Sequence, residues 1–205
     1  MFIIYISYVS KSLQNDFNIV LAAVQNNGSA LQFVQNKTPE ICKLAVQENG
    51  RALEYVRDQT PEICKLAVQR NGLALQYVEK QNEEICELAV QQNGYALEFV
   101  KHQTPEICKL AVRQFWDALQ YVREQTPEIC ELAVRQFWVA LKYVKNQTRE
   151  ICELAVQQNG DALRYVDVAL QTKELCELAV KQNGDALQYV REQTPEICEL
   201  AVTQD

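Results

Sequence analysis

The sequence is organised around QTPEICKLAVQRNGLALQYVEK, residues Gln59 to Lys80, because most of the chain repeats these 22 residues with small changes. Eight cysteines mark the register: successive cysteines lie 22 residues apart, except that 24 residues separate Cys152 from Cys176. All five prolines stand three residues before a cysteine, and all six glycines stand eight residues after the cysteine position. Helix-breaking residues therefore fall at two places per unit, which is typical of a repeat built from two short elements.

Those two places predict two short helices in each unit. Thr60 is a good N-cap, Pro61 suits the first helical position, and Glu62 lies where the helix dipole favours negative charge. The pair Asn71-Gly72 predicts a left-handed residue that ends this first helix, helix A, after about ten residues. A second helix, helix B, follows and must stop before the next proline.

The apolar residues of helix A cover too wide an arc for a helix with one buried face. Ile63, Cys64, Leu66, Ala67 and Val68 span about 200° at 100° per residue, so helix A needs neighbours on two sides. Stacked identical units meet this requirement, whereas a single unit cannot.

We therefore predict an all-α fold: an α-solenoid of about nine short helix pairs forming a single domain over residues 1–205. Residues 1–16 form a divergent N-terminal cap and residues 17–205 the repeats. The two extra residues between Asp167 and Thr172 should lengthen one helix B and bend the stack there.

The segment Val20 to Val34, VLAAVQNNGSALQFV, and each later LAVxxNGxALxYV resemble a helical repeat family of unknown function. That family occurs in long arrays in giant DNA viruses of amoebae and in some amoeba-dwelling bacteria. The resemblance covers nearly the whole chain beyond Asp16 and implies no activity. It implies an intracellular setting, in the host cytoplasm or the virion of a large DNA virus. The chain departs from the family pattern in its invariant cysteine and in two units that lack Asn-Gly.

The cysteines invite three chemical interpretations, and the spacing argues against each. A disulfide needs Cα atoms within about 7 Å, but stacked helices lie about 8–10 Å apart. A zinc site brings closely spaced cysteines or several histidines, and the chain has one histidine, His102, at a probable surface position. A nucleophile needs an adjacent base, and none recurs. We expect small core residues in a reducing compartment, and neither an enzyme, nor a metal, nor a cofactor.

Two units replace Asn-Gly with Phe115-Trp116 and Phe137-Trp138. Each could continue as one long helix of about 20 residues, which would interrupt the stack or exchange between chains. Forcing a bulky residue into the left-handed conformation costs about 1–2 kcal/mol, whereas a straightened hairpin would expose several side chains worth about 1.5–3 kcal/mol each. This comparison favours the hairpin.

If the hairpins form, the central units should present apolar residues along one edge of the solenoid, because the position after glycine is also apolar there. This ridge would be a protein-binding site, or its aromatic rings would instead fold back and fill gaps between units. The predicted ridge consists of Leu73, Tyr95, Phe115, Trp116, Phe137, Trp138 and Val139.

Charge and hydropathy limit the partners. The formal net charge of -7, with acidic and basic residues interspersed, argues against a nucleic-acid backbone, and no apolar run approaches the roughly 20 residues of a membrane helix. We expect a scaffold that binds another protein; the alternative is self-association into a homo-oligomer. Lipid-binding repeats of the apolipoprotein type, with one helix per unit, and RNA-binding solenoids with one nucleotide per repeat are weaker alternatives.

Overall fold

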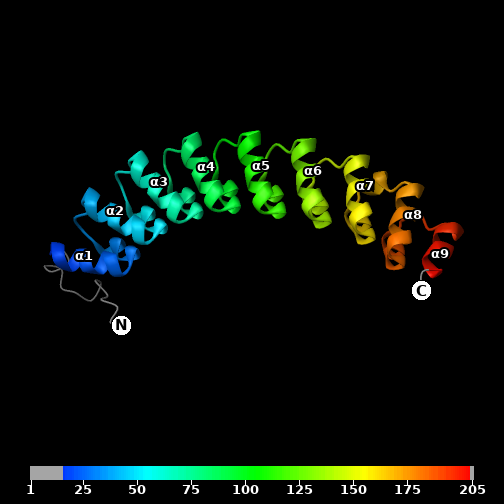
Figure 1. Ribbon diagram of the computed structural model, residues 1–205, viewed down its shortest axis with the longest axis horizontal. Helices are drawn as coiled ribbons and strands as arrows, with labels where there is room; N and C mark the ends of the chain where they lie inside the picture. Colours follow the sequence, from blue (N-terminus) through cyan, green and yellow to red (C-terminus); the bar gives the residue numbers. More distant parts are fainter. Residues whose placement is uncertain (1–15, 204–205) are drawn as a thin grey trace. The chain divides into compact units, whose positions relative to one another are not determined.

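The computed structural model describes residues 16–203, in which α-helices alternate with short 3-10 helices and no residue belongs to a strand (Figure 1). The α-helices are α1 (Phe17–Asn26), α2 (Pro39–Glu48), α3 (Pro61–Arg70), α4 (Glu83–Gln92), α5 (Pro105–Gln114), α6 (Pro127–Gln136), α7 (Arg149–Gln158), α8 (Lys173–Gln182) and α9 (Pro195–Val202). The 3-10 helices are η3 (Gly28–Phe33), η4 (Gly50–Tyr55), η5 (Gly72–Tyr77), η6 (Gly94–Phe99), η7 (Trp116–Tyr121), η8 (Trp138–Tyr143), η9 (Gly160–Tyr165), η10 (Val168–Leu170) and η11 (Gly184–Tyr189). The predicted cap at residues 1–16 lies outside the described residues apart from Asp16, whose carboxylate accepts hydrogen bonds from the first turn of α1.

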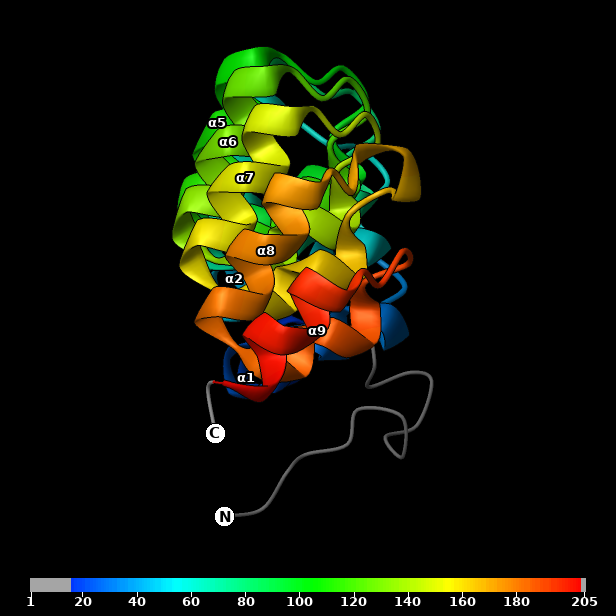
Figure 2. The ribbon, with the colours of Figure 1, turned by 90° about the vertical axis from the view of Figure 1, so that its right-hand side faces the viewer.

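The chain forms two compact units, residues 1–111 (unit 1) and 112–205 (unit 2), which divide inside α5. Within unit 1, α1 to α4 lie side by side in one layer and η3 to η6 in a second layer (Figures 1 and 2). Within unit 2, α6 to α9 and the accompanying 3-10 helices repeat this arrangement. The predicted α-solenoid of 22-residue repeats is confirmed, with helix B realised as a six-residue 3-10 helix in each complete repeat.

The start of each helix A follows the predicted signals. The Thr60 hydroxyl oxygen accepts the Ile63 N–H at 3.4 Å, and Pro61 occupies the first turn of α3. The pKa of Glu62 lies below its ordinary value because the carboxylate accepts hydrogen bonds from its own backbone N–H and from Thr60. The predicted bounds of helix A, Pro61 to Arg70, are those of α3.

The predicted left-handed residue at the end of helix A is wrong. Asn71 is extended, with φ -153° and ψ 108°, and no described residue has a positive φ. Its N–H still bonds the Ala67 carbonyl oxygen at 2.9 Å, so it completes α3 while its extended backbone turns the chain. The Asn71 side-chain oxygen then accepts the Leu73 N–H at 3.0 Å and caps η5. One asparagine thus ends one helix and starts the next.

The core repeats with the sequence. In α3, Ile63, Cys64, Ala67 and Val68 are buried, while Leu66 is only half-buried. In the following 3-10 helix the alanine and leucine are buried and the tyrosine is half-buried, and the equivalent residues of the other repeats follow the same pattern with few exceptions. Four of the α-helices, α2, α3, α7 and α8, contact an α-helix on either side, as the wide apolar arc requires.

The 24-residue step does not lengthen a helix B, contrary to the prediction. η9 keeps the six residues of its counterparts, and the extra residues form a separate short turn, η10. The regular repeat pattern begins again at Gln171. Its Nε2 donates a hydrogen bond to the Tyr189 carbonyl oxygen at 3.2 Å, as the equivalent glutamines do in other repeats. The insertion is therefore absorbed before the next repeat begins.

Candidate protein-binding surface

Glycine at the start of a 3-10 helix is explained by close packing between repeats. A Cβ built on Gly184 would lie 2.9 Å from the Ala201 carbonyl oxygen, and one on Gly50 would overlap the Ala67 carbonyl oxygen more severely. Real Cβ atoms do not approach backbone oxygen this closely. Glycine thus lets each turn press against the α-helix of the next repeat.

The two Phe-Trp repeats keep the turn, which confirms the predicted hairpin. Phe137 takes the place of asparagine between α6 and η8, with φ -159° and ψ 122°, and Phe115 has a similar extended backbone before η7. The cost of a left-handed aromatic residue therefore never arises. Neither phenylalanine can supply the side-chain cap that asparagine provides.

Trp116 and Trp138 stand where the other repeats have glycine. Since each carries a Cβ, the α-helix of the next repeat cannot approach these turns as closely as it approaches a glycine. Their rings lie instead against aromatic rings of the following repeat.

Five rings of unit 2 form one cluster, here called the aromatic cluster: Trp116, Phe137, Trp138, Tyr143 and Tyr165. The Phe137 ring lies between the two indoles, with centroids 5.2 Å from Trp116 and 5.8 Å from Trp138. Trp116 stacks on Tyr143 at 6.2 Å, and Trp138 lies 6.0 Å from Tyr165. Each tryptophan therefore contacts the tyrosine of the following repeat.

The cluster is partly covered and partly open. Within it Phe137 is 41% exposed, whereas both tryptophans are half-buried; Phe115, which lies outside the cluster, is 38% exposed. The half-buried indoles thus pack between repeats, while the two phenylalanines reach the surface. The predicted protein-binding role of these residues stays a prediction.

The remaining residues of the predicted ridge lie in both units. Leu73 and Tyr95, both half-buried, belong to unit 1, and Val139, also half-buried, follows Trp138 in unit 2. The five unit 2 members, Phe115 to Val139, come from two successive repeats. A single ridge across four repeats stays a prediction.

Two cations complete the cluster and were not predicted from the sequence. The Lys142 ammonium lies 4.5 Å from the Tyr143 centroid and 5.8 Å from that of Trp116. The Arg164 guanidinium lies 5.3 Å from the Tyr165 centroid and 5.4 Å from that of Tyr189 in the next repeat. The sequence did contain a signal for these cations: a basic residue stands directly before the tyrosine in these two repeats, whereas most other repeats have Gln or Glu at that position.

A glutamine five residues before each cysteine except Cys42 was also overlooked; it is the first residue of the 22-residue repeat, and it joins the start of the repeat to its end. The Gln59 Nε2 donates to the Tyr77 carbonyl oxygen at 2.8 Å, and its Oε1 accepts the Glu79 N–H at 3.0 Å. The same Oε1 accepts the Cys64 thiol at 3.7 Å. Equivalent sets of three bonds surround Gln81, Gln125 and Gln147.

The cysteines are structural in the described residues. None of the eight forms a disulfide, and seven of them are buried, which confirms the predicted core role. Burial raises the pKa of the Cys64 thiol and raises that of Cys152 to about 11, so the neutral thiol that donates to glutamine is the stable form. No group of three or more potential metal ligands occurs among these residues. Nor does any described helix combine the length and apolarity that a membrane span needs.

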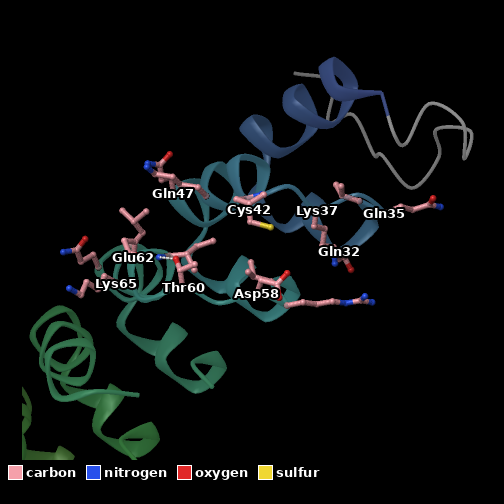
Figure 3. A pocket seen from close by; sticks show the side chains of 17 residues that line it. Gln32, Gln35, Lys37, Cys42, Gln47, Asp58, Thr60, Glu62 and Lys65 are labelled. Carbon is pink, nitrogen blue, oxygen red and sulfur yellow. Dashed lines mark hydrogen bonds between the residues drawn. The ribbon is translucent and has the colours of Figure 1, made fainter. Parts of the chain in front are cut away.

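A groove of about 1070 Å³ lies between α2 and α3 in unit 1 (Figure 3). Its lining includes Lys37, Cys42, Lys43 and Glu62, and Lys37 stands where later repeats have the bridging glutamine. A smaller groove of about 500 Å³ occupies the corresponding interval between α6 and α7. Because such grooves recur between stacked helices, we regard them as a property of the repeat and the aromatic cluster as the distinctive surface.

Comparison with known proteins agrees with the repeat architecture. A family model described as "Domain of unknown function (DUF4116)" matches residues 2–38, 60–104, 126–171 and 148–194. Two of these segments overlap with a shift of one 22-residue repeat, 126 to 148, so the model spans about two repeats. No curated protein and no solved structure matches the chain significantly.

Proposed function

The chain belongs to the DUF4116 family, a domain of unknown function, and we propose that it is a non-catalytic repeat scaffold that binds another protein through the aromatic cluster of unit 2. The observation that carries this proposal is the replacement of Asn-Gly by Phe-Trp in two consecutive repeats. The replacement removes a side-chain cap and leaves the Phe137 ring 41% exposed, and neither change improves the repeat itself.

Physical arguments support a binding role for these rings. Loss of an asparagine cap costs about 1 kcal/mol, and the part of Phe137 that stays exposed gains nothing from burial in the free protein. Tryptophan, tyrosine and arginine dominate the binding energy of protein interfaces. All three residue types meet here, where Trp138 packs on Tyr165 and Arg164 lies over the Tyr165 ring. A partner that covered Phe115 and Phe137 would bury this apolar surface.

The other repeats supply a matched control for the test. Changing Phe115→Asn, Trp116→Gly, Phe137→Asn and Trp138→Gly gives both repeats the turn used by the rest of the chain; this is the consensus variant. Wild-type and consensus proteins would capture partners from an extract of the native host, with bound proteins quantified by mass spectrometry. We expect a partner retained by the wild type and lost by the consensus variant. Identical partners for both proteins, with unchanged helicity, would remove the aromatic cluster from consideration.

A second copy of the chain is the alternative partner for the same cluster. Light scattering of both proteins over a range of concentration separates the two possibilities. A wild-type mass that rises with concentration, with a monomeric consensus variant, indicates self-association through the rings. A monomeric wild type leaves a different protein as the partner.

The setting of the proposed scaffold follows from its thiols. None of the eight cysteines forms a disulfide, so we propose that the protein works in a reducing intracellular compartment. We further propose that this compartment is the host cytoplasm or the virion. The apolipoprotein-like alternative needs one long amphipathic helix per unit. The complete repeats instead contain an α-helix and a separate 3-10 helix, so this alternative loses its structural basis.

A further inference from the structure

The aromatic cluster contains the same side-chain pair twice, shifted by one repeat. Trp116 and Tyr143 have an interplanar angle of 28°, and Trp138 and Tyr165 one of 33°. Lys142 and Arg164 accompany the two pairs and are themselves one repeat apart. Because neighbouring helices pack about 8–10 Å apart, these two aromatic positions recur at about that interval along unit 2.

This interval matches one regular peptide conformation. A polyproline II helix has three residues per turn and rises about 3.1 Å per residue, so residues i and i+3 face the same side about 9.3 Å apart. An α-helix advances about 5.4 Å per turn, and alternate residues of a strand are about 7 Å apart. Of these three intervals, that of the polyproline II conformation lies closest to the spacing of successive repeats.

The chemistry of the cluster agrees with the geometry. Proline-rich segments bind to aromatic-lined surfaces, and their preformed conformation lowers the entropic cost of binding. The side chains of Lys142 and Arg164 are exposed, and neither forms an ion pair with a described residue. Two such charges, one repeat apart, complement acidic residues that also recur every third position.

We propose that the aromatic cluster binds an extended, acidic, proline-rich peptide segment, with proline at every third position facing successive Trp-Tyr pairs and acidic residues facing Lys142 and Arg164. This inference rests on the proposed protein-binding function and names the chemistry of the partner segment. Single-stranded nucleic acid could also stack on the rings, but it binds in basic grooves that follow its backbone, whereas the cations described beside the ring pairs are the two side chains of Lys142 and Arg164.

Tryptophan fluorescence of the chain comes from the aromatic cluster, because its only two tryptophans are Trp116 and Trp138. A synthetic peptide of four Pro-Asp-Ala units would be titrated into the full chain while indole emission is followed. Control peptides are Pro-Asp-Ala-Ala units, which change the period to four, and Pro-Lys-Ala units, which reverse the charge. We expect a saturable change in emission, with affinity at least about tenfold weaker for either control. A single-stranded oligonucleotide serves as the competing ligand.

Two variants complete the test. Lys142→Glu combined with Arg164→Glu should lower the affinity for the Pro-Asp-Ala peptide about tenfold and raise that for the Pro-Lys-Ala peptide. The consensus variant has no tryptophan, so its loss of binding would be followed by the anisotropy of a labelled peptide.

The peptide inference would be overturned if the Pro-Asp-Ala and Pro-Asp-Ala-Ala peptides bound with equal affinity. It would also be overturned if no peptide changed the emission, or if the oligonucleotide alone did. If a captured partner still depends on the four aromatic residues in that case, the proposed function stands without it.

Discussion

The side-chain amide of Gln147 donates a hydrogen bond from Nε2 to the carbonyl oxygen of Tyr165, near the end of the same 22-residue repeat, at 2.7 Å. The Oε1 atom of the same amide accepts the Asp167 N–H at 2.8 Å and the Cys152 thiol at 3.4 Å. One side chain thus satisfies the backbone where a 3-10 helix ends, a place where the repeat has no hydrogen-bond ladder of its own.

Replacing Gln147 with alanine should therefore destabilise unit 2 by about 1–3 kcal/mol, because the Tyr165 carbonyl and the Asp167 N–H lose their partner. Gln193 is the matched control: its Nε2 bonds the Leu187 carbonyl oxygen of the preceding repeat at 3.1 Å, and its side chain is exposed. Gln193→Ala should change stability by less than about 0.5 kcal/mol. Urea unfolding followed by circular dichroism measures both, and equal losses would contradict a bridging role.

Gly50→Ala should destabilise unit 1 by about 1–3 kcal/mol, because the new methyl group overlaps the Ala67 carbonyl oxygen of the next helix. Gly184→Ala should cost less, since its Cβ would lie 2.9 Å from the Ala201 carbonyl oxygen and a smaller displacement relieves the overlap. Thermal unfolding of the two variants gives the order. A larger loss for Gly184→Ala would show that close approach does not explain these glycines.

The consensus variant should fold and be at most about 4 kcal/mol less stable than the wild type. It gains two asparagine caps worth about 1 kcal/mol each and loses four ring pairs worth about 0.5–1.5 kcal/mol each, so the caps offset part of the loss. Alanine at the same four positions gains no cap and should be clearly less stable. If the consensus variant is instead the less stable of the two, the rings are primarily structural and the binding proposal weakens.

Stability should fall at alkaline pH because the folded protein holds its thiols protonated. Burial raises the pKa of Cys152 to about 11, above its value in the unfolded chain, so this contribution is complete below the unfolded pKa of about 8.5. It is lost as pH rises from there through about 11. Cys152→Ala should flatten this decline relative to wild type in denaturant titrations at successive pH values. Parallel pH profiles for the two proteins would exclude the thiol as a source of the effect.

Thiol labelling should distinguish one cysteine from the rest. Cys198 is half-buried, while the other seven are buried. Under native conditions a water-soluble alkylating reagent should modify Cys198 first, and the others only as the repeats unfold. Peptide mapping after timed quenching identifies the site. Rapid labelling of Cys64 or Cys152 in folded protein would contradict their burial.

Most of the fold could be predicted from signals that act over a few residues. Thr60 and Pro61 specify where α3 begins whatever lies around them, because the cap and the fixed proline φ are local properties. The apolar arc from Ile63 to Val68 required neighbours on two sides, and stacking followed from it. The sequence by itself therefore determined the repeat, the helix A bounds and the core positions, and it singled out the two Phe-Trp units.

Only the tertiary structure decided what the turns are for. Gly50 is explained by the Ala67 oxygen 17 residues later, and Gln147 by the Tyr165 carbonyl 18 residues later, so neither role is visible in the local pattern. Trp116 meets Tyr143 and Lys142 only because a later repeat stacks beside it at a particular distance. That distance depends on how closely two backbones can pack, which is set by the side chains of both repeats together.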